Sequence, residues 1–132
     1  MPELLTQQPM ELRALSVARV HEWHPDQAEQ RLCSTTHIQQ VGRLLQLTRI
    51  RPAEARLFNL LSWLAERFGT TTKQGRTVPL EAMHLTHRQL AEMASVSRVT
   101  VTKTLGHFRQ QGWLQRVGEE EVLTQVGFDA PP

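Results

Sequence analysis

The sequence predicts a mainly α-helical fold with a small β component, a winged helix-turn-helix preceded by a dimerisation helix. Three observations predict it. Residues 85–114 have the pattern of two short amphipathic helices joined by a tight turn. Residues 115–126 hold two short β-type runs around a glycine-containing turn. Residues 38–48 carry an apolar face that is broad for a short isolated helix.

The first helix of the pair has a clear beginning. Thr86 followed by Gln89 fits the capping box, in which a hydroxyl and an amide each satisfy a free backbone N–H. Leu90, Met93 and Ala94 then form a stripe at i, i+3 and i+4, which predicts the face turned toward the core. We therefore expect a short helix that ends near Ala94.

The second helix is predicted to begin after Ser97, a residue type suited to the N-cap. Val101, Leu105 and Phe108 form its apolar face. Gly112 tolerates a positive φ and predicts the C-terminal stop. The helix pair has the shape that places an α-helix in the major groove of DNA.

The outward side of the second helix has the side chains for that role. Arg98 can make a two-pronged contact with guanine, and Val99 can pack on a thymine methyl. Lys103 offers a point charge to a guanine edge or a phosphate. Ser97 and Thr100 carry hydroxyls suited to phosphate oxygens. The alternative interpretation is an ordinary helical hairpin with a solvated basic face.

Residues 85–114 resemble the DNA-binding unit of the Crp/Fnr family of bacterial transcription regulators, and looser similarity runs from about residue 12 to residue 126. Within that family, the segment 97–106 is most similar to the recognition helix of the cyanobacterial global nitrogen regulator. The resemblance implies that Arg98 contacts a guanine and that Val99 and Lys103 lie beside neighbouring bases. It also implies four phosphate contacts, made by His87, Arg88, Ser97 and Thr100.

Two positions depart from the family pattern. The family often has glycine in the turn, where a left-handed conformation is needed, and this chain has Ser95, so we expect strain or a variant turn there. Arginine is usual where Lys103 stands, which puts guanine selectivity at that position in doubt.

The resemblance further implies an effector-binding sensor domain of which only a tail is present. Residues 12–23, with a brief strand-like alternation at 15–17, resemble its final strands, and residues 25–50 resemble its closing helices. We therefore expect residues 1–36 to be a remnant of that domain or an N-terminal extension. Its phosphate-binding segment has no counterpart, and one cysteine cannot hold an Fnr-type iron–sulfur cluster, so we expect no cofactor.

Residues 37–51 are the predicted dimerisation helix. Ile38, Val41 and Leu45 lie on one face of it, and Leu44 widens that face. Such a face could pair with its counterpart in a second subunit, and the family resemblance favours this. The alternative is that the face packs on its own domain.

Pro52 is predicted to be a hinge between the dimerisation helix and the DNA-binding domain, because proline ends one helix and suits the start of the next. The DNA-binding domain is predicted over residues 52–126 and a tail over residues 127–132. Residues 77–80 are a candidate edge strand. The helix after Pro52 is predicted to end at Gly69 and to turn one apolar stripe inward: Leu57, Leu60, Leu61, Leu64 and Phe68.

The wing is predicted as strands at 115–117 and 122–126, with Glu119, Glu120 and Glu121 at or near its tip. Three carboxylates beside a phosphate backbone would be repulsive. The wing therefore points away from DNA, faces a basic protein surface, or weakens DNA binding. A solubilising turn is the simplest interpretation.

Charge is distributed unevenly although the formal net charge is only +2. Residues 84–117 hold five basic side chains and one acidic one, whereas residues 118–132 hold four acidic side chains and no basic one. A basic face beside an acidic tail fits one surface that meets phosphates.

Several classes of protein are disfavoured. Cys33 is the single cysteine, which fits a reducing cytosol, and no segment is apolar and long enough to span a bilayer, so we expect a cytoplasmic protein. His21, His24, Cys33 and His37 have spacings that zinc could use, but ordinary surface roles are favoured and no metal site is predicted. No catalytic constellation stands out, so we expect no enzyme activity.

The sequence thus predicts a sequence-specific, DNA-binding transcription regulator that binds a palindromic double-stranded site as a homodimer. The alternative is a protein-interaction module, which heterodimerises with a full-length paralogue or contacts RNA polymerase through the acidic wing. A weaker alternative is a regulator with an effector pocket at the dimerisation helices.

Overall fold

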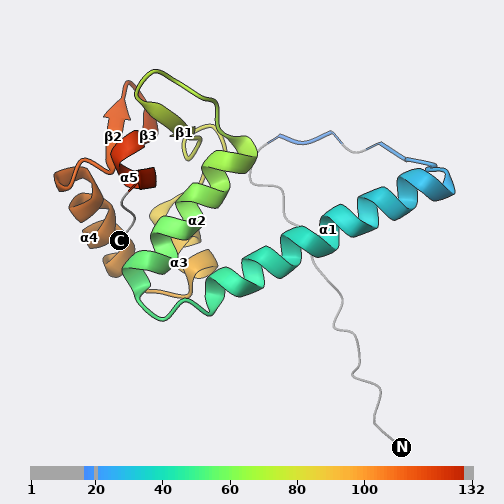
Figure 1. Cartoon of the computed structure of the whole chain (residues 1–132), viewed down its shortest axis with the longest axis horizontal. Coiled ribbons are helices and arrows are strands. Elements are labelled where there is room, and N and C mark those ends of the chain that lie inside the picture. Colours follow the sequence, from blue (N-terminus) through green and yellow to red (C-terminus); the bar gives the residue numbers. More distant parts are fainter. Residues whose placement is uncertain (1–16, 20, 130–132) are drawn as a thin grey trace, which may run out of the picture.

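The computed structural model describes residues 17–19 and 21–129 of the 132-residue chain. The described part is mainly helical with one small sheet, which confirms the predicted fold class, and one long helix extends from it as an arm (Figure 1). The elements in chain order are α1 (Gln27–Thr48), α2 (Ala53–Phe68), β1 (Gly75–Val78), α3 (His87–Ala94), α4 (Arg98–Gln110), β2 (Leu114–Val117), β3 (Glu120–Thr124) and α5 (Gln125–Asp129).

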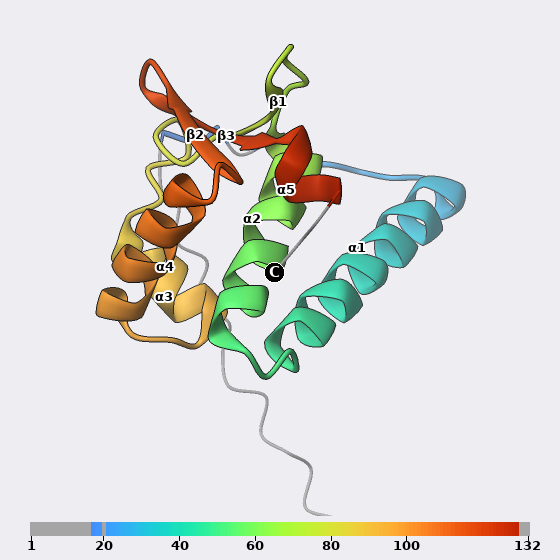
Figure 2. The same ribbon diagram turned by 60° about the vertical axis from the view of Figure 1, so that its left-hand side comes forward.

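Helix α2 is the centre of the core, with α3 and α4 on one side and the sheet at one end (Figure 2). Its four predicted leucines are buried, as is Phe58, which the stripe did not single out. The prediction for Phe68 is wrong, because its side chain is 49% exposed. Phe68 lies in the last turn of α2, and its ring packs edge-on against Trp63 with a centroid distance of 6.0 Å.

The sheet is antiparallel with strand order β1-β3-β2. β1 is an edge strand, but it begins and ends two residues earlier than predicted, because Pro79 has no N–H to donate to a ladder. Gly75 opens it opposite Thr124, where an added Cβ would lie 1.9 Å from the Leu123 carbonyl oxygen. Only glycine fits at that position.

The prediction that the second wing strand spans residues 122–126 is wrong at both ends, because β3 covers residues 120–124. Thr124 pairs with the first residue of β1, and Leu123 pairs with the first residue of β2. Residues beyond 124 therefore have no strand beside them. The chain continues as α5, and the tail predicted from residue 127 begins inside that helix.

Helix α1 begins at a capping box between Asp26 and Glu29 and is continuous through residues 36 and 37, where the sequence-based division placed a boundary. None of its 22 residues is buried. The strand-like residues 15–17 lie outside the described part of the chain except for Val17, which is not in a strand. Of the helices described, none has the length and apolar character needed to cross a membrane.

Candidate nucleic-acid interface

Both helices of the predicted helix-turn-helix begin where the sequence placed them. At α3, the Gln89 N–H donates to the Thr86 hydroxyl at 3.3 Å, and the Thr86 N–H donates to the Gln89 side-chain oxygen at 2.8 Å. At α4, the Thr100 N–H donates to the Ser97 hydroxyl at 3.0 Å. These caps satisfy N–H groups that have no partner within the helix, so the start of each helix is set locally.

The turn between the two helices contains the expected strain. Ser95 has φ 51° and ψ 50°, a left-handed conformation that costs a non-glycine residue about 1 kcal/mol. The turn is closed by the Val96 N–H, which donates to the Ala91 carbonyl at 2.9 Å. At the other end of α4, Gly112 has φ 73°, as predicted for the stop.

Met93 does not join the inward stripe as predicted, because its side chain is 37% exposed. Leu90 and Ala94 are buried against the core, whereas Met93 lines an apolar hollow with Leu44 and Leu47 of α1. The buried face of α3 is therefore narrower than the spacing of its apolar residues predicted. The hollow has a volume of about 170 Å³ and lies where α1, α2 and α3 meet.

The three candidate base-contacting residues are all exposed in the first half of α4. Val99 is 62% exposed, whereas Val101, two residues on and on the opposite face of the helix, is fully buried. Neither Arg98 nor Lys103 has a side-chain hydrogen bond to any residue that the structure describes. The geometry leaves a guanidinium, an isopropyl group and an ammonium available at the capped end of one helix.

The four candidate phosphate-contacting residues surround this end, and each has a local partner. His87 Nδ1 lies 3.0 Å from the hydroxyl of Thr102, and Arg88 Nε donates to Glu92 at 3.2 Å. The hydroxyls of Ser97 and Thr100 share a hydrogen bond of 2.8 Å. The Arg88–Glu92 pair is exposed and contributes about 0.5 kcal/mol or less, so a phosphate can displace it.

The acidic wing differs from its prediction. Glu119 and Glu120 lie at the turn, but Glu121 does not, because its side chain is only 9% exposed and is ion-paired with Arg109 of α4. The register places Glu121 opposite Arg116, one pair in from the turn. Of the three glutamates, only Glu121 has a basic partner in the described structure, and Glu119 and Glu120 remain exposed at the turn. The contact of Glu121 with Arg109 fastens the last turns of α4 to the central strand.

The predicted dimer residues separate into two groups. Ile38, Val41 and Leu45 are 68%, 41% and 59% exposed and follow one another at spacings of three and four along α1. Leu44 packs instead against the core of its own domain. The free apolar stripe is thus narrow, as in a coiled-coil seam.

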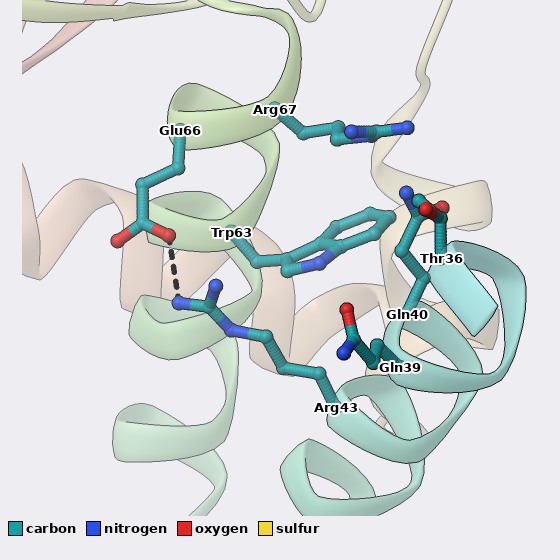
Figure 3. Close-up of a pocket in the computed structure, with 7 residues that line it drawn as sticks. All are labelled: Thr36, Gln39, Gln40, Arg43, Trp63, Glu66 and Arg67. Carbon is teal, nitrogen blue, oxygen red and sulfur yellow. Dashed lines mark hydrogen bonds and ion pairs between the residues drawn. The ribbon is translucent and has the colours of Figure 1, made fainter. Parts of the chain in front are cut away.

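On its other face, α1 meets α2 across an open groove of about 340 Å³ (Figure 3). Trp63 projects into the groove from α2 between Arg43 and Arg67, and Arg43 donates to Glu66 at 2.6 Å. Both partners of that ion pair are largely exposed, so its contribution to stability is small. Among the residues described, no group of three or more His, Cys, Asp or Glu side chains could hold a metal ion.

Arg56 is a residue that sequence reasoning missed. Its guanidinium lies between the end of α1 and the turn of the helix-turn-helix, and donates to carbonyls on both sides. The sequence showed only a basic residue beside the apolar stripe of α2, and nothing in that pattern indicates two carbonyl partners far apart along the chain.

Comparison with known proteins agrees with this geometry. Residues 55–125 match the Crp-like helix-turn-helix domain family. The chain is 38% identical over 108 residues to the regulatory protein CysR of Synechococcus elongatus, covering 82% of this chain and 52% of that protein. It is 30% identical over 124 residues to a CRP-like cAMP-activated global transcriptional regulator of Mycobacterium tuberculosis, covering 86% and 52%. The chain thus spans about half the length of these curated relatives.

Solved structures show the same fold. TTHB099, a transcriptional regulator of the CRP family from Thermus thermophilus, superposes with a TM-score of 0.60 at 17% identity, over 79% of this chain and 53% of that one. TTHA1359, a CRP/FNR family regulator from the same organism, gives 0.57 at 17% identity, over 80% and 54%. The capped helix pair, the wing and the match over residues 55–125 lead to one conclusion: this chain belongs to the Crp-like helix-turn-helix domain family.

Proposed function

We propose that the chain binds a palindromic DNA site as a homodimer, with the first half of each α4 in one major groove. The observation that carries this proposal is the exposed group of Arg98, Val99 and Lys103 at the capped start of α4. Arg98 would read a guanine through its two-pronged donor, Val99 would pack on a thymine methyl, and Lys103 would meet a neighbouring base or phosphate.

The phosphate contacts would come from His87, Arg88, Ser97 and Thr100. They lie at the starts of α3 and α4, where free backbone N–H groups and the helix dipoles favour anions. The resemblance of residues 97–106 to the recognition helix of the cyanobacterial global nitrogen regulator implies half-sites of GTA type.

A second subunit would pair through the exposed stripe of Ile38, Val41 and Leu45, because an apolar seam at spacings of three and four is the pattern of a two-helix coiled coil. Two-fold symmetry then requires half-sites about 34 Å apart on one face of the duplex. The prediction that residues 1–36 are a sensor remnant or an extension remains open to test.

The alternative of an interaction module with an acidic wing would have only Glu119 and Glu120 to offer, since Glu121 is internal and ion-paired. The test is a titration of the chain on a GTA-type palindrome and on scrambled DNA of equal length, across salt concentrations. We expect tighter binding to the palindrome at every salt concentration, and affinity for both that falls as salt rises. Equal affinity for the two duplexes at all salts would overturn the proposal.

A further inference from the structure

Arg56 occupies an unusual place for a charged residue on a core helix. One guanidinium nitrogen, Nη1, donates to the carbonyl of Thr48, the last residue of α1, at 3.5 Å and to the carbonyl of Ile50, two residues beyond it, at 3.2 Å. The other, Nη2, donates to the carbonyl of Ser95 at 3.5 Å, in the turn between α3 and α4. One side chain therefore joins the end of α1 to a turn that lies 39 residues beyond Arg56 in the chain.

Two of the three carbonyls that Arg56 contacts, those of Thr48 and Ser95, lie at helix C-termini, where a helix cannot satisfy them internally. The last carbonyls of a helix carry partial negative charge and lack N–H partners. A cation between two such ends is attracted to both. Arg56 Nε is buried without a partner in the described structure, so the position is maintained by the two forked nitrogens alone.

We expect the other contacts between α1 and the domain to fix the direction of α1 less firmly than the Arg56 hydrogen bonds do. Arg43 and Glu66 form an ion pair across the groove of Figure 3, and a solvent-accessible pair of this kind contributes little to stability. Leu44 packs against the core of the domain, and with Leu47 it borders the hollow where α1, α2 and α3 meet. The segment between α1 and α2 is only residues 49–52, so a fixed point there sets the direction of the whole arm.

We propose that Arg56 is a positioning residue, which fixes the angle between α1 and the helix-turn-helix by bridging the end of α1 to the turn at Ser95. The effect of this role on DNA binding rests on the proposed function as a dimer. If α1 joins two subunits, the angle at Arg56 determines whether both α4 helices meet successive major grooves at once. Loss of the bridge would then weaken binding to a palindrome more than binding to a single half-site.

The direct test needs no DNA and measures a distance between α1 and α4, which depends on the angle between them. Spin labels are placed on the native, exposed Cys33 of α1 and on α4 through Gln110→Cys, and labelled chains are diluted with unlabelled ones. We expect one narrow distance distribution for this labelled parent. Arg56→Met and Arg56→Lys should both broaden it, because neither side chain has the forked donors.

Arg51→Met is the matched control. It removes a positive charge from the same hinge, but Arg51 is exposed and has no side-chain hydrogen bond among the described residues. The control should keep the narrow distribution. Distributions as narrow in Arg56→Lys as in the parent would overturn the proposal. If Arg56→Met does not fold, as judged by its melting curve, the width of the distance distribution in Arg56→Lys decides whether the proposal holds.

The second readout is the ratio of affinities for a palindrome and for a half-site. We expect that ratio to fall by about tenfold in Arg56→Lys, with half-site affinity unchanged. A merely structural role would lower both affinities together and would count against the proposal. If the unsubstituted chain shows no preference for the palindrome, the proposed function fails, while the distance measurement still judges the role of Arg56.

Discussion

Helix α1 and the domain that follows it are held in place in different ways. The domain from residue 53 has a continuous core of fully buried side chains from α2, α3, α4 and the sheet, including Leu61, Leu90, Leu105 and Phe108. α1 is the longest helix described, yet it buries none of its residues. A helix of 22 residues in water gains little from propensity alone and normally depends on packing. The domain therefore contains its own stabilisation, whereas α1 needs another surface.

The largest effect should come from the core of the domain. We expect Leu105→Ala to lower the free energy of unfolding by about 2–5 kcal/mol, because the side chain is fully buried and its removal leaves a cavity. Leu45→Ala on α1, at a chain concentration low enough to keep it monomeric, should change it by about 0.5 kcal/mol or less. Chemical denaturation measures both. Similar losses of unfolding free energy for the two variants would contradict the difference between the domain and α1.

The exposed stripe on α1 offers the next largest effect. Val41→Lys would place two like charges across a symmetric seam and should weaken dimerisation by on the order of 3 kcal/mol, while the melting of the monomeric domain stays unchanged. Light scattering over a concentration series gives the dimer dissociation constant. Gln46→Lys, which adds the same charge at another exposed position of α1, should leave that constant unaltered. A monomeric parent chain would remove the basis for the stripe as an interface.

Substitutions at the start of α4, the end proposed to face DNA, should change binding without loss of stability. Arg98→Ala is expected to cost about 1–3 kcal/mol of binding to the palindrome and to relax its sequence preference, since the side chain is exposed and has no structural partner described. Arg88→Ala should weaken binding to all sequences alike and reduce the salt dependence. A larger loss of selectivity for Arg88→Ala would reverse the two roles. Fluorescence anisotropy at several salt concentrations measures both quantities.

The smallest effect is expected for serine-to-glycine substitutions, which we compare in the helix-turn-helix and in α1. Ser95→Gly should stabilise the domain by about 0.5–1 kcal/mol, because glycine adopts the left-handed turn without strain. Ser34→Gly, within α1, should instead destabilise that helix by about 0.5 kcal/mol. Thermal unfolding followed by circular dichroism tests both. Stabilisation at both sites would show that local conformation does not explain the change at Ser95.

Local chemistry explains which features could be predicted. The caps at Thr86 and Ser97, the left-handed turn at Ser95 and the stop at Gly112 each depend on a few neighbouring residues. Short-range patterns determine them, and the sequence predicted each one. The limits of β1 and β3 were less accurate, because a strand ends where its neighbour ends, and that neighbour lies far away in the chain.

The misassigned side chains have a common cause. Phe68 and Met93 follow the apolar periodicity of their helices, but Phe68 lies in the last turn of α2, at the edge of the core, and Met93 borders the hollow between α3 and α1. Glu121 follows two other glutamates, yet the register turns it inward to Arg109. Periodicity identifies the face of a helix on which a residue lies, but it does not show how far the opposing surface extends.

The sequence by itself determined the helix-turn-helix, its caps and the three base-facing candidates on α4, because these depend on contacts within a few residues. Only the tertiary structure decided that Arg56 lies between the end of α1 and the turn at Ser95. It also decided which apolar residues of α1 remain exposed. Such contacts join segments distant in the chain, and their energies depend on packing that no local pattern encodes.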